Sequence, residues 1–347
     1  MPSFTDITAY FATNRNRKSD GTYGNRFYEG DARLIRAGEA ALLKNAAQGT
    51  WNLDEVKTYP ERSRAASEDD RAEREWVTLG SSSAFGNMRA SGISGETSDI
   101  LIYLHGAGNS FESSSETLGQ MIDLYSQDRA QLCPFFFTYP ANGKSDPVNY
   151  FADRDDASIS GPAMARAFGK LVDFLINKRL EERCSQRIHL LAHSLGNFAL
   201  RKAVEAIFRN TAHRPVRLFD TVFLAHADDD EDTLNHPGKM RNLTRLADKI
   251  VVYFDGTDKL LRLSDTVHLD RLGQKGPNPH PGTLVNGCEI AAVDCELTAF
   301  DLAPDRQRHR HFLQSSAVVN DIKAVIHGNP TEGRTPVEGV EGVFRLS

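Results

Sequence analysis

Ser194 lies in the segment IHLLAHSLGNFALRKAVEAIF, where a buried apolar run ends and an amphipathic helical pattern begins. Small residues, Ala192 and Gly196, stand two positions before it and two positions after it. A serine nucleophile in such a setting sits on a sharp strand-to-helix turn, with its hydroxyl above the carboxyl end of a sheet. The alternative is a serine that merely caps the helix N-terminus. The five-residue pattern alone is weak, but the strand before it and the helix after it favour a nucleophile.

A second motif, His105–Gly108, follows directly on the apolar run ILIYL. A turn of this HG type after an early strand can point a backbone N–H at the oxyanion of a tetrahedral intermediate. We therefore expect the amides of Ala107 and Leu195 to form an oxyanion hole. His105 is expected to brace the turn rather than to transfer protons. On its own, the motif could also be an ordinary tight turn between a strand and a helix.

A serine nucleophile needs a base, and the base needs an orienting carboxylate. In hydrolases with this kind of serine turn, the acid follows the serine and the histidine comes last. The run IVVYF leads into DGTDKLL, so Asp255 and Asp258 both lie just beyond the end of a predicted strand. Asp258, after the turn at Gly256, is better placed, and Asp228 in FLAHADDDED is its competitor. The alternative for each is an aspartate that caps a turn or helix.

Two histidines, His309 and His311, stand in DRQRHRHFLQSSAVVNDI, just before the last predicted helix. Both can reach the carboxyl end of the sheet, and at least one of them belongs to an exposed basic loop. His193, next to the serine, is expected to pack or shape the site rather than to act as its base.

The remaining motifs give little support to a metal or a nucleotide. The acidic segment His226–Asp232 could bind a divalent cation, but a solvated acidic surface is the more common outcome. Neither a CxxC pair nor zinc-like spacing occurs among the four cysteines, Cys133, Cys184, Cys288 and Cys295. No glycine-rich phosphate-binding motif is present. We expect no cofactor and no metal.

These residues must be positioned by elements that alternate along the chain from residue 100 onward. Apolar runs of strand length are Ile100–Leu104, Phe135–Thr138, Ile188–Ala192, Thr221–Ala225, Ile250–Phe254 and Glu289–Val293. Helical patterns are Phe111–Asp128, Gly161–Leu180, Leu195–Phe208, Arg241–Ala247 and Ser315–Ile326. Strands separated by helices imply crossover connections. The predicted fold class is therefore α/β, with a mostly parallel central sheet and helices on both faces.

The catalytic positions span one core, which we assign to residues 96–328. Residues 1–95 are predicted to be an N-terminal extension packed on that core, and 329–347 a C-terminal tail. Within the extension we expect a helix near Asp31–Ala47, a short strand near Trp76–Leu79 and a connector or surface hairpin over Gly80–Asp99. The breaker-rich segment Arg271–Gly287 is a candidate flap near the site.

Composition excludes several classes of function. The chain has 347 residues, of which 40% are apolar and 25% charged, as in ordinary globular proteins. A net charge of -6 gives no general attraction to nucleic acid or anionic lipid. No apolar stretch is long enough to span a membrane, and the first residues do not resemble a signal peptide. We expect a cytoplasmic protein that acts on a small acyl substrate.

Together the motifs resemble an uncharacterised, esterase/lipase-like branch of the α/β-hydrolase superfamily found largely in bacteria. The resembling segments occur in the family's order over residues 9–328. They are YFATNR, HGAGNSF, FTYPANG followed by Tyr150 and Asp153, LLAHSLGN, YFDGTDKLL, and His309 ahead of SSAVVNDI. This set is far more specific than the serine motif alone.

The resemblance implies that Ser194 is the nucleophile, Asp258 the acid and His309 the base. His309 is favoured over His311 because its distance to the closing helix fits the family spacing. The chain departs from the family at Tyr139, where tryptophan is usual, and at Ala107 and the following glycine, where bulkier or polar residues are common. These changes are expected to enlarge or reshape the acyl pocket.

From these features we expect a serine hydrolase that acts on carboxylic esters without a cofactor. The same triad could instead cleave thioesters, amides or peptides, or support transferase or lyase chemistry. A non-catalytic binding protein built on a hydrolase fold is the alternative from a different class.

Overall fold

The computed structural model describes residues 5–28, 31–59, 80–94, 99–127, 132–143, 147–176, 186–209, 216–265, 270–329 and 333–347. Strands over these residues are β1 (Asp6–Thr13), β2 (Arg15–Arg17), β3 (Tyr23–Phe27), β4 (Arg36–Lys44), β5 (Trp51–Tyr59), β6 (Ile100–Leu104), β7 (Cys133–Thr138), β8 (Ile188–His193), β9 (Phe219–Ala225), β10 (Ala247–Phe254), β11 (Leu284–Val285), β12 (Cys288–Asp294), β13 (Thr335–Pro336) and β14 (Val343–Arg345). Helices are α1 (Gly80–Ser94), α2 (Phe111–Tyr125), α3 (Pro147–Ile176), α4 (Leu195–Arg209), the 3₁₀ helix η3 (Arg241–Arg245), α5 (Lys259–Asp265), α6 (Leu272–Lys275), α7 (His311–Gln314) and α8 (Ser316–Ile326).

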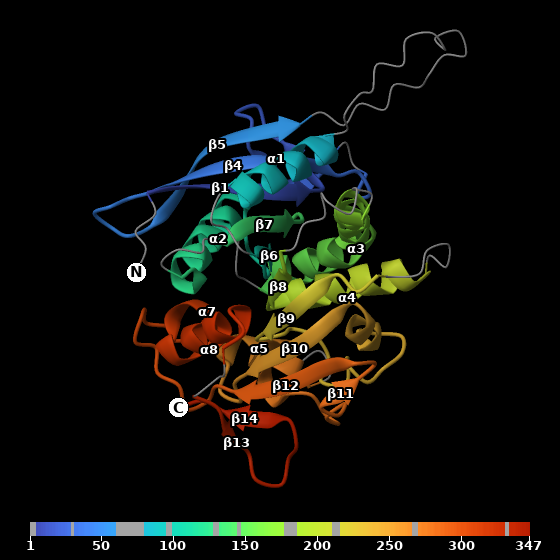
Figure 1. The fold of residues 1–347 in the computed structure, drawn as a ribbon, viewed down its shortest axis with the longest axis vertical. Coiled ribbons are helices and arrows are strands. Elements are labelled where there is room, and N and C mark those ends of the chain that lie inside the picture. Colours follow the sequence, from blue (N-terminus) through green and yellow to red (C-terminus); the bar gives the residue numbers. More distant parts are fainter. Residues whose placement is uncertain are drawn as a thin grey trace.

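The central feature is a 12-stranded sheet in the order β13-β14-β12-β10-β9-β8-β6-β7-β1-β4-β5, with β11 paired to β12 (Figure 1). The pairs from β14 to β1 along this order are all parallel, whereas β4, β5, β11 and β13 pair antiparallel. Strands β2 and β3 form a separate hairpin. The predicted α/β class and mostly parallel sheet are confirmed.

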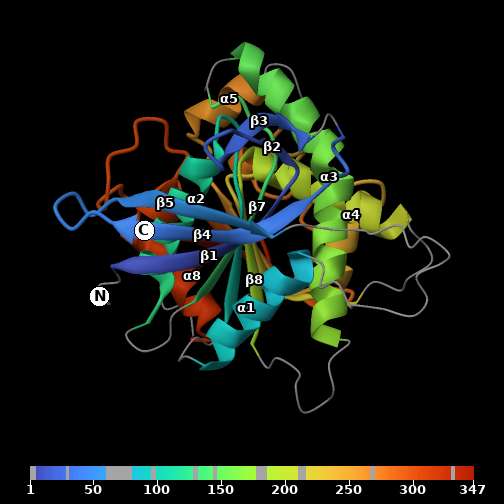
Figure 2. The same cartoon turned by 90° about the horizontal axis from the view of Figure 1, so that it is seen from above.

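Helices cover both faces of the sheet, as the alternating pattern predicted. One face packs against α1, α3 and α4, and the other against α2, α7 and α8. Figure 2 shows α2 and α8 on one side of the sheet and α3 and α4 on the other. The central strands β6, β7 and β8 are buried on both faces, which explains their continuous apolar sequences.

Two expectations for the N-terminal region are wrong. The helix expected near Asp31–Ala47 is replaced by β4, which is hydrogen-bonded to β1 on one side and β5 on the other. Pairing on both sides outweighs the helix propensity of its alanines and leucines. The connector expected over Gly80–Asp99 contains helix α1, because Phe85 and Met88 lie one helical turn apart and both enter the core.

The N-terminal strands do more than pack on the core, because β1 pairs in parallel with β7 and so extends the sheet itself. The strand expected near Trp76–Leu79 lies outside the described residues. At the other end, the predicted tail contains β14, which pairs in parallel with β12. The helix expected over Arg241–Ala247 is the shorter η3, and Ala247 already belongs to β10.

The segment Arg271–Gly287 is only partly exposed. Its first four residues, which include the start of α6, are buried, and its last part contributes the short strand β11. None of the helices in the described ranges combines the length and the apolar character needed to cross a membrane.

Candidate active site

The polar residues that the sequence analysis singled out lie where the parallel strands end. His105 follows β6, Ser194 follows β8, His226 follows β9, and Asp255 and Asp258 follow β10. The carboxyl ends of parallel strands meet at one edge of a sheet, where open α/β sheets bind their ligands. Figure 2 shows that α5 and the β2–β3 hairpin both lie on this side of the sheet.

Ser194 occupies a strained turn between β8 and α4. Its φ is 53°, in the left-handed region that residues with a side chain rarely adopt. The turn is held by hydrogen bonds from the Ser194 amide to the carbonyl of Ala225 (3.0 Å) and from the Asp228 amide to the carbonyl of Ser194 (3.1 Å). The side-chain amide of Asn197 also donates to the Ser194 carbonyl at 3.0 Å. The half-buried Ser194 side chain is therefore presented on a rigid support.

Small residues are required around this turn because two backbones meet there. A Cβ added to Gly196 would lie 2.6 Å from the carbonyl oxygen of Leu104. A Cβ added to Gly106 would lie 2.9 Å from the Cβ of Ser194. The structure thus brings the HG turn after β6 into direct contact with the serine turn after β8.

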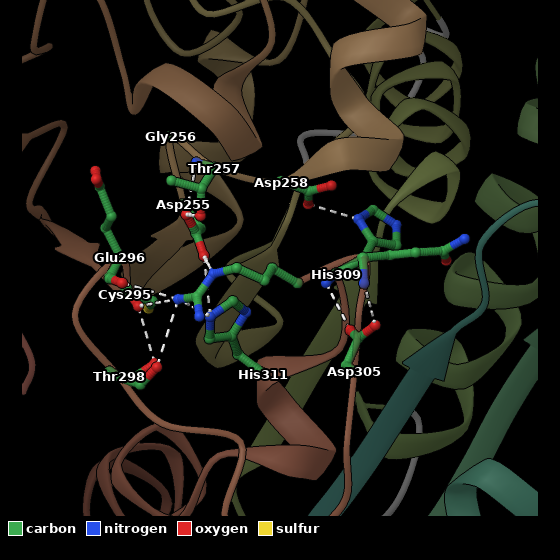
Figure 3. A network of polar contacts seen from close by, with 12 residues as sticks. Asp255, Gly256, Thr257, Asp258, Cys295, Glu296, Thr298, Asp305, His309 and His311 are labelled. Atoms are coloured by element: carbon green, nitrogen blue, oxygen red, sulfur yellow. Dashed lines mark hydrogen bonds and ion pairs between the residues drawn. The ribbon is translucent and has the colours of Figure 1, made fainter.

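His309 and Asp258 form a buried pair in which His309 Nδ1 lies 2.6 Å from Asp258 Oδ2. Figure 3 shows the two side chains facing each other. Asp258 is positioned at the start of α5, where its Oδ1 accepts the amides of Leu260 (2.9 Å) and Leu261 (3.1 Å). The backbone amide of His309 donates to Asp305 at 2.7 Å. Both side chains of the pair are therefore fixed from their own loops.

The pair is electrostatically matched. Burial alone would raise the pKa of the Asp258 carboxyl, but the charge of His309 and hydrogen bonds from His226 and His309 hold that pKa well below its usual range. Burial alone would lower the pKa of His309, but the Asp258 carboxylate outweighs this effect and the pKa of His309 lies above its ordinary value. Since Nδ1 faces the carboxylate, Nε2 is the nitrogen left for proton transfer.

His193 connects this pair to the serine turn. Its Nε2 lies 3.0 Å from the carbonyl oxygen of His309, and the two rings are 4.8 Å apart. Burial lowers the pKa of His193 well below its ordinary value, so its ring is neutral. Because His193 precedes Ser194 in the chain, this contact ties the loop that carries His309 to the serine turn, in keeping with the expected shaping role.

The turn after β6 is fixed by side chains from other elements. The Gly108 amide donates to Asp153 Oδ2 at 2.7 Å, and the side-chain amide of Asn109 donates to the carbonyls of Gly106 and Ala107. The amides of Ala107 and of Leu195, the first residue of α4, have no acceptor within the part of the chain that the structure describes. Two backbone donors near the serine are thus available to an oxyanion.

His105 braces this turn from beneath, as expected. Its Nδ1 lies 2.8 Å from the carbonyl of Gly106, and its Nε2 lies 3.0 Å from the hydroxyl of Thr138 and 3.3 Å from the amide of Tyr139. Burial, with a further contribution from nearby Arg15, lowers the pKa of His105 to about 3, so its ring is neutral. Tyr139 is fully buried and stacks on His105 at 4.2 Å, so this departure from the family supports the turn from behind.

Arg15 in β2 is a residue that sequence reasoning did not assign to the site. Its fully buried guanidinium donates to the carbonyl of Asn109 (2.7 Å), to the hydroxyl of Thr138 (2.7 Å) and to the carbonyl of Gly24 (3.1 Å). The segment YFATNR ends in this arginine, but the neighbouring basic residues RNR resemble an exposed edge. Only the tertiary contacts reveal its role in holding the turn after β6.

The two second choices have other partners. His311 Nε2 lies 3.2 Å from Asp255 Oδ2, and this carboxylate also accepts a hydrogen bond from Arg308 at 2.8 Å. Figure 3 shows His311 beside Asp255. Burial lowers the pKa of His311 to about 4. Asp228 Oδ2 accepts the hydroxyl of Tyr150 at 2.6 Å. The structure therefore brings His309 to Asp258, whereas His311 belongs to a separate pair with Asp255.

The acidic segment His226–Asp232 is not the solvated surface that was favoured. Asp229 is fully buried and paired with Arg201 at 2.8 Å, and Asp230 is paired with Lys239 at 2.9 Å. These carboxylates are neutralised by basic side chains, which removes the reason to expect a cation there.

One group of residues has the composition of a metal site. His226, Asp258 and His309 each place a possible ligand atom within 4.8 Å of the others. Two ligands of a tetrahedral zinc ion, with bonds of about 2.0 to 2.1 Å, lie about 3.3 Å apart. The 2.6 Å separation between His309 and Asp258 is that of a charge-assisted hydrogen bond instead. His226 itself is a second residue that sequence reasoning did not assign to Asp258, from which its Nδ1 lies 3.1 Å away.

The parallel sheet, the serine turn after β8 and the acid and histidine beyond β10 define the protein as an α/β hydrolase. The chain belongs to the family described as alpha/beta hydrolase of unknown function (DUF900), whose model matches residues 83–327. No curated protein and no solved structure matches the chain significantly. The family match confirms the expected superfamily. It begins within α1, so β1–β5 and Arg15 lie outside it.

Proposed function

We propose that this hydrolase cleaves carboxylic esters through an acyl-enzyme on Ser194. The observation that carries the proposal is the buried 2.6 Å hydrogen bond between His309 and Asp258, on a loop tied through His193 to the serine turn. A carboxylate that stays ionised beside a histidine with a raised pKa is the arrangement that a general base requires.

The proposed reaction proceeds in two halves. His309 Nε2 removes the proton of the Ser194 hydroxyl as its oxygen attacks the ester carbonyl, and the amides of Ala107 and Leu195 stabilise the oxyanion. The protonated histidine then gives that proton to the departing alcohol. In the second half, His309 removes a proton from water, which attacks the acyl carbonyl, and Ser194 leaves with the proton as the carboxylic acid is released. Asp258 holds the histidine tautomer throughout.

A screen of acyl substrates with the purified protein tests this proposal. The panel contains p-nitrophenyl esters of short and long chain, together with thioester and anilide analogues. We expect turnover of the esters that falls to background in Ser194→Ala but persists in Ser316→Ala, a matched change at the start of α8. Turnover of thioesters or anilides alone would overturn the ester assignment. Binding without turnover of any acyl compound would favour a non-catalytic binding protein.

A further inference from the structure

The Asp258 carboxylate has two imidazole partners. Its Oδ2 lies 2.6 Å from Nδ1 of His309 and 3.1 Å from Nδ1 of His226, while Oδ1 accepts the amides of Leu260 and Leu261. All these contacts reach a carboxylate that is fully buried. A base-orienting aspartate needs one histidine, so the second ring requires an explanation.

His226 is held firmly at this place. It is fully buried, and its φ of 46° lies in the left-handed region. Its amide donates to the carbonyl of Tyr253 at 3.0 Å, and its ring stacks on His311 at 4.5 Å with an angle of 12°. Gly273 packs directly against the backbone of His226, because a Cβ added to Gly273 would lie 2.2 Å from the carbonyl carbon of His226. A strained backbone conformation persists where the surrounding structure fixes it, often at functional sites.

A histidine that only fills the core would account for the packing but not for the polar contacts. His226 Nε2 is buried without a hydrogen-bond partner in the described residues, so Nδ1 is the nitrogen through which the ring makes a polar contact, and that contact is Asp258. Because an ionised carboxylate can only accept a hydrogen bond, Nδ1 of His226 carries the ring proton and donates it to Asp258. Burial of an unpaired nitrogen costs free energy, which an apolar ring of the same shape would avoid.

We propose that His226 is a positioning residue that fixes the Asp258 carboxylate and shares its Oδ2 with His309. This inference rests on the proposed function. A carboxylate oxygen that accepts a second hydrogen bond attracts the His309 proton less strongly. The second hydrogen bond thus limits the rise in the pKa of His309 that the Asp258 carboxylate causes, which favours the neutral form that acts as a base. The other charged or titratable groups that face His309 within the described residues are Asp228, Asp305 and His193, and Arg310 acts on His193 in turn.

Two substitutions separate the hydrogen bond from the packing. His226→Phe keeps an aromatic ring stacked on His311 but removes the donor. His226→Asn keeps an N–H at the position of Nδ1, and asparagine tolerates a positive φ. His311→Phe is the matched control, because it alters the other ring of the stack without touching Asp258. If His226→Phe does not fold, His226→Gly removes the donor and relieves the backbone strain.

The pKa of His309 is measured by NMR titration of the folded protein without substrate, and the pH dependence of kcat/KM is measured with p-nitrophenyl acetate. We expect His226→Phe to raise the pKa of His309 by about one pH unit, to move the acid limb of kcat/KM by the same amount and to lower kcat about tenfold. His226→Asn and His311→Phe should stay near wild type in all three measurements.

A His309 pKa in folded His226→Phe equal to that in His311→Phe would overturn the inference. Failure of the proposed function is distinguishable from this result. If wild type hydrolyses no ester, the proposed function is wrong, while the NMR titration still decides whether His226 controls the proton of His309.

Discussion

Replacement of Arg15 by methionine should lower both the stability and the catalytic rate of the enzyme, although Arg15 lies outside the matched family region. The guanidinium donates to the carbonyls of Asn109 and Gly24 and to the hydroxyl of Thr138. The first of these contacts holds the turn that carries the Ala107 amide. Arg15→Met keeps a long apolar stem but leaves these acceptors without their donor.

The expected loss of stability follows from two opposing effects. Burial, partly offset by Tyr139 and nearby acidic side chains, lowers the pKa of Arg15 to about 10, which corresponds to a net cost of about 3 kcal/mol for the charged form. Hydrogen bonds from a charged donor contribute about 1.5 to 3 kcal/mol each, and buried acceptors left unpaired cost about 1 to 3 kcal/mol each. Three such hydrogen bonds together contribute about 4.5 to 9 kcal/mol, which exceeds the net cost of about 3 kcal/mol, so the free energy of unfolding should fall by about 1.5 to 6 kcal/mol.

The expected loss of rate follows from the oxyanion hole. Removal of one oxyanion donor costs about 10²- to 10³-fold in kcat, so a displaced Ala107 amide should cost about 10- to 100-fold. Urea unfolding and ester kinetics measure the two effects, with Arg17→Met as the control because Arg17 ends the same strand and is exposed. A folded Arg15→Met enzyme with the kcat of Arg17→Met would refute the role of Arg15 in holding the turn.

Three further substitutions test separate parts of the site and the fold. Gly106→Ala places a Cβ 2.9 Å from the Cβ of the proposed nucleophile and should lower kcat at least tenfold. Gly86→Ala is the control, because its added Cβ meets nothing within 4 Å and should leave kcat unchanged. Equal kcat values for the two variants would contradict the close approach of Gly106 to Ser194. Asp258→Asn should lower kcat about 10³- to 10⁴-fold at pH 7 and move the acid limb of the pH profile to lower pH, because the imidazolium of His309 loses its counter-charge. Asp255→Asn should lower kcat much less, and the reverse ranking of the two variants would exchange the roles of the two aspartates. Burial alone would raise the pKa of Asp99, but its basic neighbours outweigh this effect and lower that pKa to about 2. Asp99→Asn should therefore lower the free energy of unfolding by about 1 to 2 kcal/mol at pH 7, and this difference should fade as pH falls from about 4 to 2. A difference in urea unfolding that is still unchanged at pH 2 would contradict this prediction.

Local sequence signals were sufficient for the centre of the fold. The apolar runs at β6 and β8 are buried on both faces and therefore carry no polar interruption, and the amphipathic pattern of α4 follows at once. Ser194 could be singled out because its small neighbours are required by contacts within a few residues of the turn and by the backbone of the HG motif. The order of acid and histidine then directed attention to Asp258 and to His309 or His311, and the family resemblance favoured His309.

Features that depend on long-range contacts could not be predicted in the same way. The sequence of β4 has alanines and leucines typical of a helix, and only its two neighbouring strands make it extended. Arg15 and His226 are polar residues in segments that resemble exposed basic or acidic loops, and burial by distant elements gives them their contacts. Strand β14 is too short for a periodic pattern and forms through its pairing with β12.

Covalent labelling of Ser194 tests the central claim most directly. The purified protein is treated with a fluorophosphonate, and the modified residue is located by mass spectrometry of its peptides. We predict one adduct per chain on Ser194, which is lost in Ser194→Ala and strongly slowed in Asp258→Asn. An adduct on another residue, or undiminished labelling of a folded Ser194→Ala variant, would contradict the assignment of Ser194 as the nucleophile.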